Sequence, residues 1–128
     1  MGRGRPWCGC RPSGSDSGFS KPTRALTFEV AACWACGTTA IRLEDWPYAR
    51  QLLEEAVRLG AESDEIGEVV ALALLDLARV HEAAGDVVEA RRLVIRAASK
   101  GREHGLPSYA PRRWRDLVDY GRNLELEL

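Results

Sequence analysis

From Leu26 onward, the apolar residues of this chain recur at helical spacing, and strict alternation is rare. Gly60, Gly85 and Gly105 stand where three helices would end, and a helix often closes on a glycine in the left-handed conformation. The pattern predicts an all-α fold with short connections. Its five expected helices cover residues 24–43, 47–59, 64–84, 86–104 and 111–123.

The third of these stretches is apolar on more than one side. Its large apolar residues are Val69, Val70, Leu72, Leu74, Leu75, Leu77 and Val80. A helix that is apolar most of the way round is buried between neighbours rather than resting on a surface. We therefore expect residues 64–84 to form the central helix of the fold.

The chain repeats itself at a constant offset. Residues 46–60 match residues 87–101 through the pairs Ala49/Ala90, Arg50/Arg91, Leu52/Leu93, Ala56/Ala97 and Gly60/Gly101, each 41 residues apart. The preceding helices match at the same offset, with Cys33, Cys36 and Gly37 opposite Leu74, Leu77 and Ala78. A third copy of the first helix follows forty residues later, with Trp114 and Leu117 at the positions of Leu74 and Leu77. Two helices in register over two copies indicate a structural repeat.

The order of large and small residues in this unit resembles the tetratricopeptide repeat. The second copy matches best, through Leu74, Leu77, Ala78, the Gly85-Asp86 turn, Ala90, Val94 and Ala97. The resemblance covers about residues 29–122, although His81 and Ala40 replace the usual aromatic residue of the first helix. The unit is longer than the usual repeat of about 34 residues, which makes it similar to the long-unit arrays of bacterial regulators and kinesin light chains.

The resemblance implies a short array of helical hairpins, about two and a half repeats long. Such arrays generally need about three repeats and polar caps for stability. Three alternatives stay open for the missing half repeat. Either residues 111–123 cap the array, or the chain forms a homodimer, or the chain is part of a longer protein.

The N-terminal residues differ in composition from the rest. Residues 1–24 are rich in Gly, Ser and Pro and carry a net charge of +4, so residues 25–128 carry −5 of the total of −1. A segment with so little apolar surface cannot offset the entropy of ordering. We expect a disordered basic tail over 1–24 and a repeat domain over 25–128.

Composition also excludes several function classes. The 18 basic and 19 acidic side chains leave no basic excess, so a nucleic-acid partner is not expected. No stretch has the pattern of a secretory signal or the length of a membrane span, which favours the cytoplasm and no membrane partner.

The four cysteines raise the question of zinc. They form the pairs Cys8/Cys10 and Cys33/Cys36, whereas a strong zinc pattern would have two C-x2-C pairs. Cys33 and Cys36 fall on positions that the second copy fills with leucine, so we interpret them as small buried hydrophobes. We expect no metal, and no disulfide in a cytoplasmic chain.

No catalytic constellation is visible. Neither His81 nor His104 has the neighbours of a nucleophile–base pair, and no phosphate-binding glycine loop follows a strand. We therefore expect no enzyme activity and no cofactor.

The resemblance implies a partner site. In tetratricopeptide arrays the first helices of successive repeats line a concave groove that holds a peptide or a protein. The matching positions here are Trp34, Thr38 and Arg42 in the first copy, Arg79 and Glu82 in the second, and Arg112, Arg115 and Arg122 in the third. These residues predict a ligand with acidic groups and at least one apolar side chain, because arginine suits carboxylates and Trp34 is an apolar anchor. Alternatively, Arg112, Arg113 and Arg115 form an ordinary solvated cap.

Two functions fit these observations. The first is a protein–protein interaction module, a scaffold that binds a peptide or protein through the groove. The second is a detached sensor or regulatory portion of a bacterial transcriptional regulator, whose DNA-binding part lies elsewhere.

Overall fold

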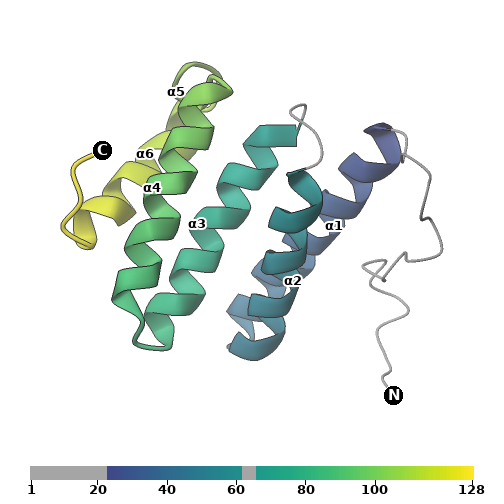
Figure 1. The fold of residues 1–128 in the computed structure, drawn as a ribbon, viewed down its shortest axis with the longest axis horizontal. Coiled ribbons are helices and arrows are strands. Elements are labelled where there is room, and N and C mark those ends of the chain that lie inside the picture. The colour runs from purple at the N-terminus through teal and green to yellow at the C-terminus, as the bar shows by residue number, and fades with distance from the viewer. Residues whose placement is uncertain (1–22, 62–65) are drawn as a thin grey trace.

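A computed structural model describes residues 23–61 and 66–128, and over these ranges the fold is all-α (Figure 1). The five expected helices are all present, and a short helix that we did not predict stands before the last of them. The helices are α1 (Thr23–Arg42), α2 (Trp46–Gly60), α3 (Gly67–Ala83), α4 (Val87–Glu103), α5 (Leu106–Tyr109) and α6 (Pro111–Asn123).

The predicted tail lies almost entirely outside the described residues. Only Thr23 and Arg24 are described, and they are the first two residues of α1. The predicted boundary at residue 25 therefore falls inside this helix. The other residues of the tail, including Cys8 and Cys10, remain outside the described ranges.

The turns of the α1–α2 and α3–α4 hairpins both end in an aspartate that caps the following helix. Asp45 accepts a hydrogen bond from the backbone N–H of Tyr48 at the start of α2, and Asp86 accepts one from Glu89 at the start of α4. An aspartate at this position satisfies a backbone donor that the first turn of a helix leaves unpaired. The caps are 41 residues apart, so the turns preserve the offset seen in the sequence.

Two of the three predicted helix-ending glycines adopt the left-handed conformation. Gly85 has φ +88° and Gly105 has φ +75°. Gly60 does not have a positive φ and belongs to the last turn of α2, so its predicted role is wrong. A Cβ atom at Gly60 would lie 2.1 Å from Cγ2 of Val70. Glycine is needed there because α2 and α3 approach each other closely.

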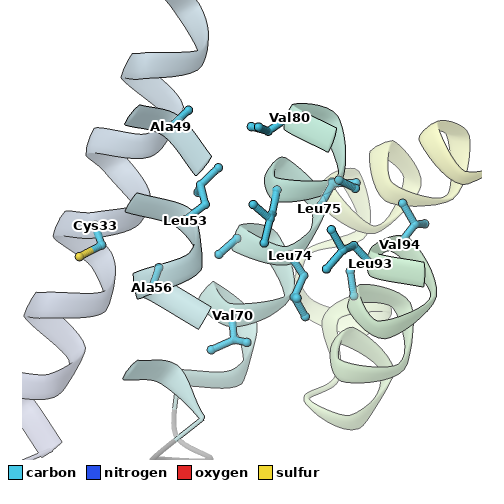
Figure 2. Close-up of a cluster of buried hydrophobic side chains, with 14 of the residues drawn as sticks. Cys33, Ala49, Leu53, Ala56, Val70, Leu74, Leu75, Val80, Leu93 and Val94 are labelled. Atoms are coloured by element: carbon cyan, nitrogen blue, oxygen red, sulfur yellow. The ribbon is translucent and has the colours of Figure 1, made fainter. Parts of the chain in front are cut away.

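Neighbouring helices pack side by side in chain order (Figure 1). The hairpins α1–α2 and α3–α4 pack against each other through α2 and α3, while α1 also contacts α3 and α4 contacts α6. Nearly every residue of α3 from Val70 to Val80 is buried, which confirms the prediction of a central helix. Figure 2 shows part of the resulting core, with Leu53 of α2 facing the side chains of α3.

The two described cysteines lie on α1. Cys33 is fully buried and Cys36 is half-buried, as expected from the leucines at the matching positions of the second copy. The sulfur of Cys33 is disulfide-bonded, so the expectation of no disulfide is wrong for this residue.

Within 23–61 and 66–128, none of the helices is both long enough and apolar enough to cross a lipid bilayer.

Candidate functional site

A groove with a volume of about 300 Å³ lies between α1, α3 and α6. Its walls combine large apolar side chains with three guanidinium groups and two carboxylates. The lining residues are Trp34, Thr38, Ile41 and Arg42 of α1, Leu72, Leu75, Asp76 and Arg79 of α3, and Arg113 and Asp116 of α6. We refer to this hollow as the α1/α3/α6 groove.

The floor of the groove is organised around a buried carboxylate. Trp34 donates its indole N–H to Oδ2 of Asp76 over 2.8 Å, and Nη1 of Arg79 donates to Oδ1 over 3.2 Å. Arg113 lies over the Trp34 ring with its Cζ 5.7 Å from the ring centroid, within the range of a cation–π contact. These contacts connect α1, α3 and α6 through one cluster of polar and aromatic side chains.

Burial raises the pKa of Asp76 above its ordinary value. The hydrogen bond from Trp34 and the charges of Arg79 and Arg113 act in the opposite direction, but they offset only part of the effect of burial. Asp76 is the one charged or polar residue that is buried in the described part of the chain, with 7% of its surface exposed. Its ionised form is therefore costly for the folded state.

The effect of Asp76 on stability should depend on pH. Because its pKa is higher in the folded chain than in the unfolded one, the folded state binds the proton more tightly. The contribution of protonated Asp76 to stability is complete below the pKa of Asp76 in the unfolded chain. It is lost as the pH rises through the pKa of Asp76 in the folded chain. Asp76→Asn keeps an acceptor for Trp34 and has no charge to desolvate, so its stability relative to wild type should increase between pH 3 and pH 7. Urea denaturation of both chains across this range measures the difference, and a relative stability that falls with pH contradicts the assignment.

A second cluster lies on α3 and α6 beside Arg79. Tyr120 donates its hydroxyl to Oε1 of Glu82 over 2.5 Å, and Cζ of Arg79 lies 5.3 Å from the centroid of the Tyr120 ring. Burial and the neighbouring Glu82 raise the pKa of Tyr120, so the phenol remains a hydrogen-bond donor at neutral pH. This cluster links α6 to α3, and its aromatic ring also contacts Arg79.

The structure brings together half of the predicted site residues. Trp34, Thr38, Arg42 and Arg79 all line the groove. Glu82 does not line it but accepts the hydrogen bond from Tyr120.

The three predicted residues of α6 lie outside this groove. Arg112, Arg115 and Arg122 are exposed and do not line the groove, which Arg113 and Asp116 line instead. Arg122 pairs with Asp119 on the outer surface at 3.4 Å. The two lining residues of α6 each come one position after Arg112 and Arg115, which corresponds to about 100° around the helix. The expected register did not include the short helix α5, which stands between α4 and α6.

Sequence reasoning missed Asp76, Arg113 and Asp116. One signal could have identified Asp76, because it is the single charged residue in the apolar run 69–78. A charge within such a run has to find partners when the helix is buried. No comparable signal marks Arg113, which has arginines on nearby positions of the same helix.

No cluster of three metal-ligating side chains occurs in the ranges that the structure describes. The groove instead offers hydrogen-bond donors, positive charge and apolar surface, which are means of non-covalent recognition.

The chain matches no protein-family model, no curated protein and no solved structure.

Proposed function

We propose that this chain is a protein–protein interaction module of the tetratricopeptide-repeat type, and that its α1/α3/α6 groove binds a peptide segment of a partner protein. The proposal is supported by the two hairpins α1–α2 and α3–α4, which repeat the same residues and the same aspartate caps at an offset of 41. The groove lies on α1, α3 and α6, which correspond to the first helices of the successive copies.

The observation that carries the proposal is the placement of two arginines beside an apolar wall. Arg42 and Arg113 both line the groove, and neither forms an ion pair with any other residue in the described part of the chain. Arg79, in contrast, is paired with Asp76. A guanidinium group that is not in an ion pair can donate two hydrogen bonds to a ligand carboxylate.

The apolar side of the groove defines the rest of the ligand. Ile41, Leu72 and Leu75 form a wall next to the half-buried ring of Trp34. Buried aromatic anchors of this kind contribute much of the binding energy at protein interfaces. The ligand that fits is a peptide with at least one carboxylate and one large apolar side chain.

Selection from a library of short random peptides displayed on phage tests this proposal. Peptides retained by the wild-type chain should be enriched in Asp or Glu together with Leu, Ile, Phe or Trp. The same library passed over an Arg42→Glu/Arg113→Glu variant should lose this enrichment. A consensus rich in Lys or Arg, or an acidic consensus that the variant retains equally well, would overturn the proposal.

A further inference from the structure

Arg42 and Arg113 lie at opposite ends of the α1/α3/α6 groove. The Cζ of Arg113 is 5.7 Å from the centroid of the Trp34 ring, and its charge acts to lower the pKa of Asp76, which accepts the indole N–H of Trp34. Arg42 belongs to the same helix as Trp34 but follows it by eight residues. Because an α-helix rises about 1.5 Å per residue, Arg42 is about 12 Å further along α1 than Trp34 and the guanidinium group above it.

The helices that line the groove, α1, α3 and α6, run in the same direction (Figure 1). On α6, Arg113 lies over Trp34, whereas Tyr120, about two turns later, donates its hydroxyl to Glu82 near the end of α3. The groove therefore has one axis, which runs along α1 from the Arg113 end to the Arg42 end.

The part of the groove between the two arginines is unfavourable for a further acidic side chain. It is lined by the carboxylates of Asp76 and Asp116 and by the guanidinium group of Arg79, which is paired with Asp76. Asp116 follows Arg113 by about one turn of α6, so its negative charge faces the middle of the groove. An acidic ligand residue in this position would be repelled. The groove therefore favours two separate acidic residues over a continuous acidic run.

The size of the groove favours an extended ligand. An α-helix with its side chains is about 10–12 Å across, so about 12 Å of helix would occupy at least about three times the groove volume of about 300 Å³. An extended chain advances about 3.3 Å per residue, and its side chains alternate between two faces. Side chains that share a face and are about 12 Å apart are therefore four positions apart, because two positions span only about 7 Å and six span about 20 Å.

We propose that the groove selects an extended segment of a partner protein in which two acidic residues stand four positions apart. One carboxylate faces Arg113 beside Trp34, and the other faces Arg42. An apolar side chain of the ligand packs at the Arg113 end, where Trp34 and Leu75, which match each other at the offset of 41, both line the groove. This inference rests on the proposed function, to which it adds the spacing and the conformation of the ligand.

A series of synthetic peptides tests the spacing. Each labelled peptide has twelve residues and the same composition, with two glutamates, a leucine directly outside each glutamate, and serine and glycine elsewhere. The glutamates are two, four, six or eight positions apart. Fluorescence anisotropy with the full chain should give a dissociation constant at least about fivefold lower for a separation of four, because only this separation lets both carboxylates contact an arginine. Equal dissociation constants, or an optimum at eight, which indicates a helical ligand, would overturn the proposal.

Substitutions of the arginines test which residues set the spacing. Arg42→Ala should remove the preference for a separation of four, whereas Arg115→Ala, which changes an exposed arginine of α6 outside the groove, should keep it. Arg42→Glu/Arg113→Glu should bind the same series with lysine in place of both glutamates, again with an optimum at four. A preference that survives Arg42→Ala, or a lysine series without this optimum, would contradict the assignment. Because Arg42 and Arg113 are exposed, the variants should keep the wild-type far-ultraviolet circular dichroism.

Failure of this inference can be told apart from failure of the proposed function. If acidic peptides bind the wild-type chain and lose affinity for Arg42→Glu/Arg113→Glu, but show no preferred separation, the spacing is wrong and the groove remains the peptide site. If none of the series binds the wild-type chain and the phage selection enriches no acidic peptide, both proposals are wrong.

Discussion

Replacing Leu53 by alanine should lower the free energy of unfolding by about 2–5 kcal/mol, the range observed for large-to-small changes in well-packed cores. Leu53 has none of its surface exposed and is among the largest fully buried side chains of the described core. It lies on α2, which packs against α1 of its own hairpin and against α3 of the other hairpin (Figure 2). On the α1 side it packs so closely that a Cβ atom at Gly37 would lie 2.8 Å from its Cγ. Truncation therefore leaves a cavity where α1, α2 and α3 meet.

Leu43→Ala is the matched control for this prediction, because the same side chain is 74% exposed at the end of α1. Surface changes of this kind usually alter stability by less than about 0.5 kcal/mol. Urea denaturation followed by circular dichroism measures both variants. Equal losses of unfolding free energy for Leu53→Ala and Leu43→Ala would show that Leu53 does not occupy the junction of α1, α2 and α3.

The helices and their order could be predicted because they depend on local periodicity. The apolar spacing of residues 64–84 is sufficient to identify a helix buried between neighbours, and the offset of 41 identifies the two hairpins before any contact is known. Asp45 and Asp86 cap their helices at the same offset of 41. These features require only the geometry of a single helix and its ends.

Features that depend on how helices approach each other were harder to predict. Gly60 has the sequence context of a helix-ending glycine, yet the close approach of Val70 explains it better. The short helix α5 escaped prediction because four residues carry too little periodicity. Leu106, which is completely buried, fixes it against Gly101 of α4.

The candidate site contains both kinds of feature, those that depend on a single helix and those that depend on packing between helices. Trp34, Thr38 and Arg42 of α1 and Arg79 of α3 were predicted from the offset of 41, whereas Glu82 of α3 lies outside the groove. On α6, Arg113 and Asp116 line the groove in place of Arg112 and Arg115, which lie one position earlier in the sequence. The bond between Trp34 and Asp76 joins residues 42 positions apart. Such a pairing depends on the packing of α1 against α3, which the sequence pattern does not specify.

The proposed groove can be tested directly with two charge-reversed chains that carry the same number of substitutions on similar exposed arginines. Arg42→Glu/Arg113→Glu changes two arginines that line the groove, whereas Arg112→Glu/Arg115→Glu changes two that lie outside it. Reversing a charge that contacts a ligand carboxylate replaces attraction by repulsion, so the effect should be large.

The decisive measurement is the dissociation constant of one acidic, apolar peptide selected on the wild-type chain, determined by fluorescence anisotropy for all three proteins. Arg42→Glu/Arg113→Glu should weaken binding by about 10- to 100-fold, which corresponds to about 1.4–2.8 kcal/mol. Arg112→Glu/Arg115→Glu should change it less than about threefold, in line with the small effect of charges outside a contact. Equal losses of peptide affinity in the two variants, or a larger loss in Arg112→Glu/Arg115→Glu, would contradict the assignment of the α1/α3/α6 groove as the partner-binding site.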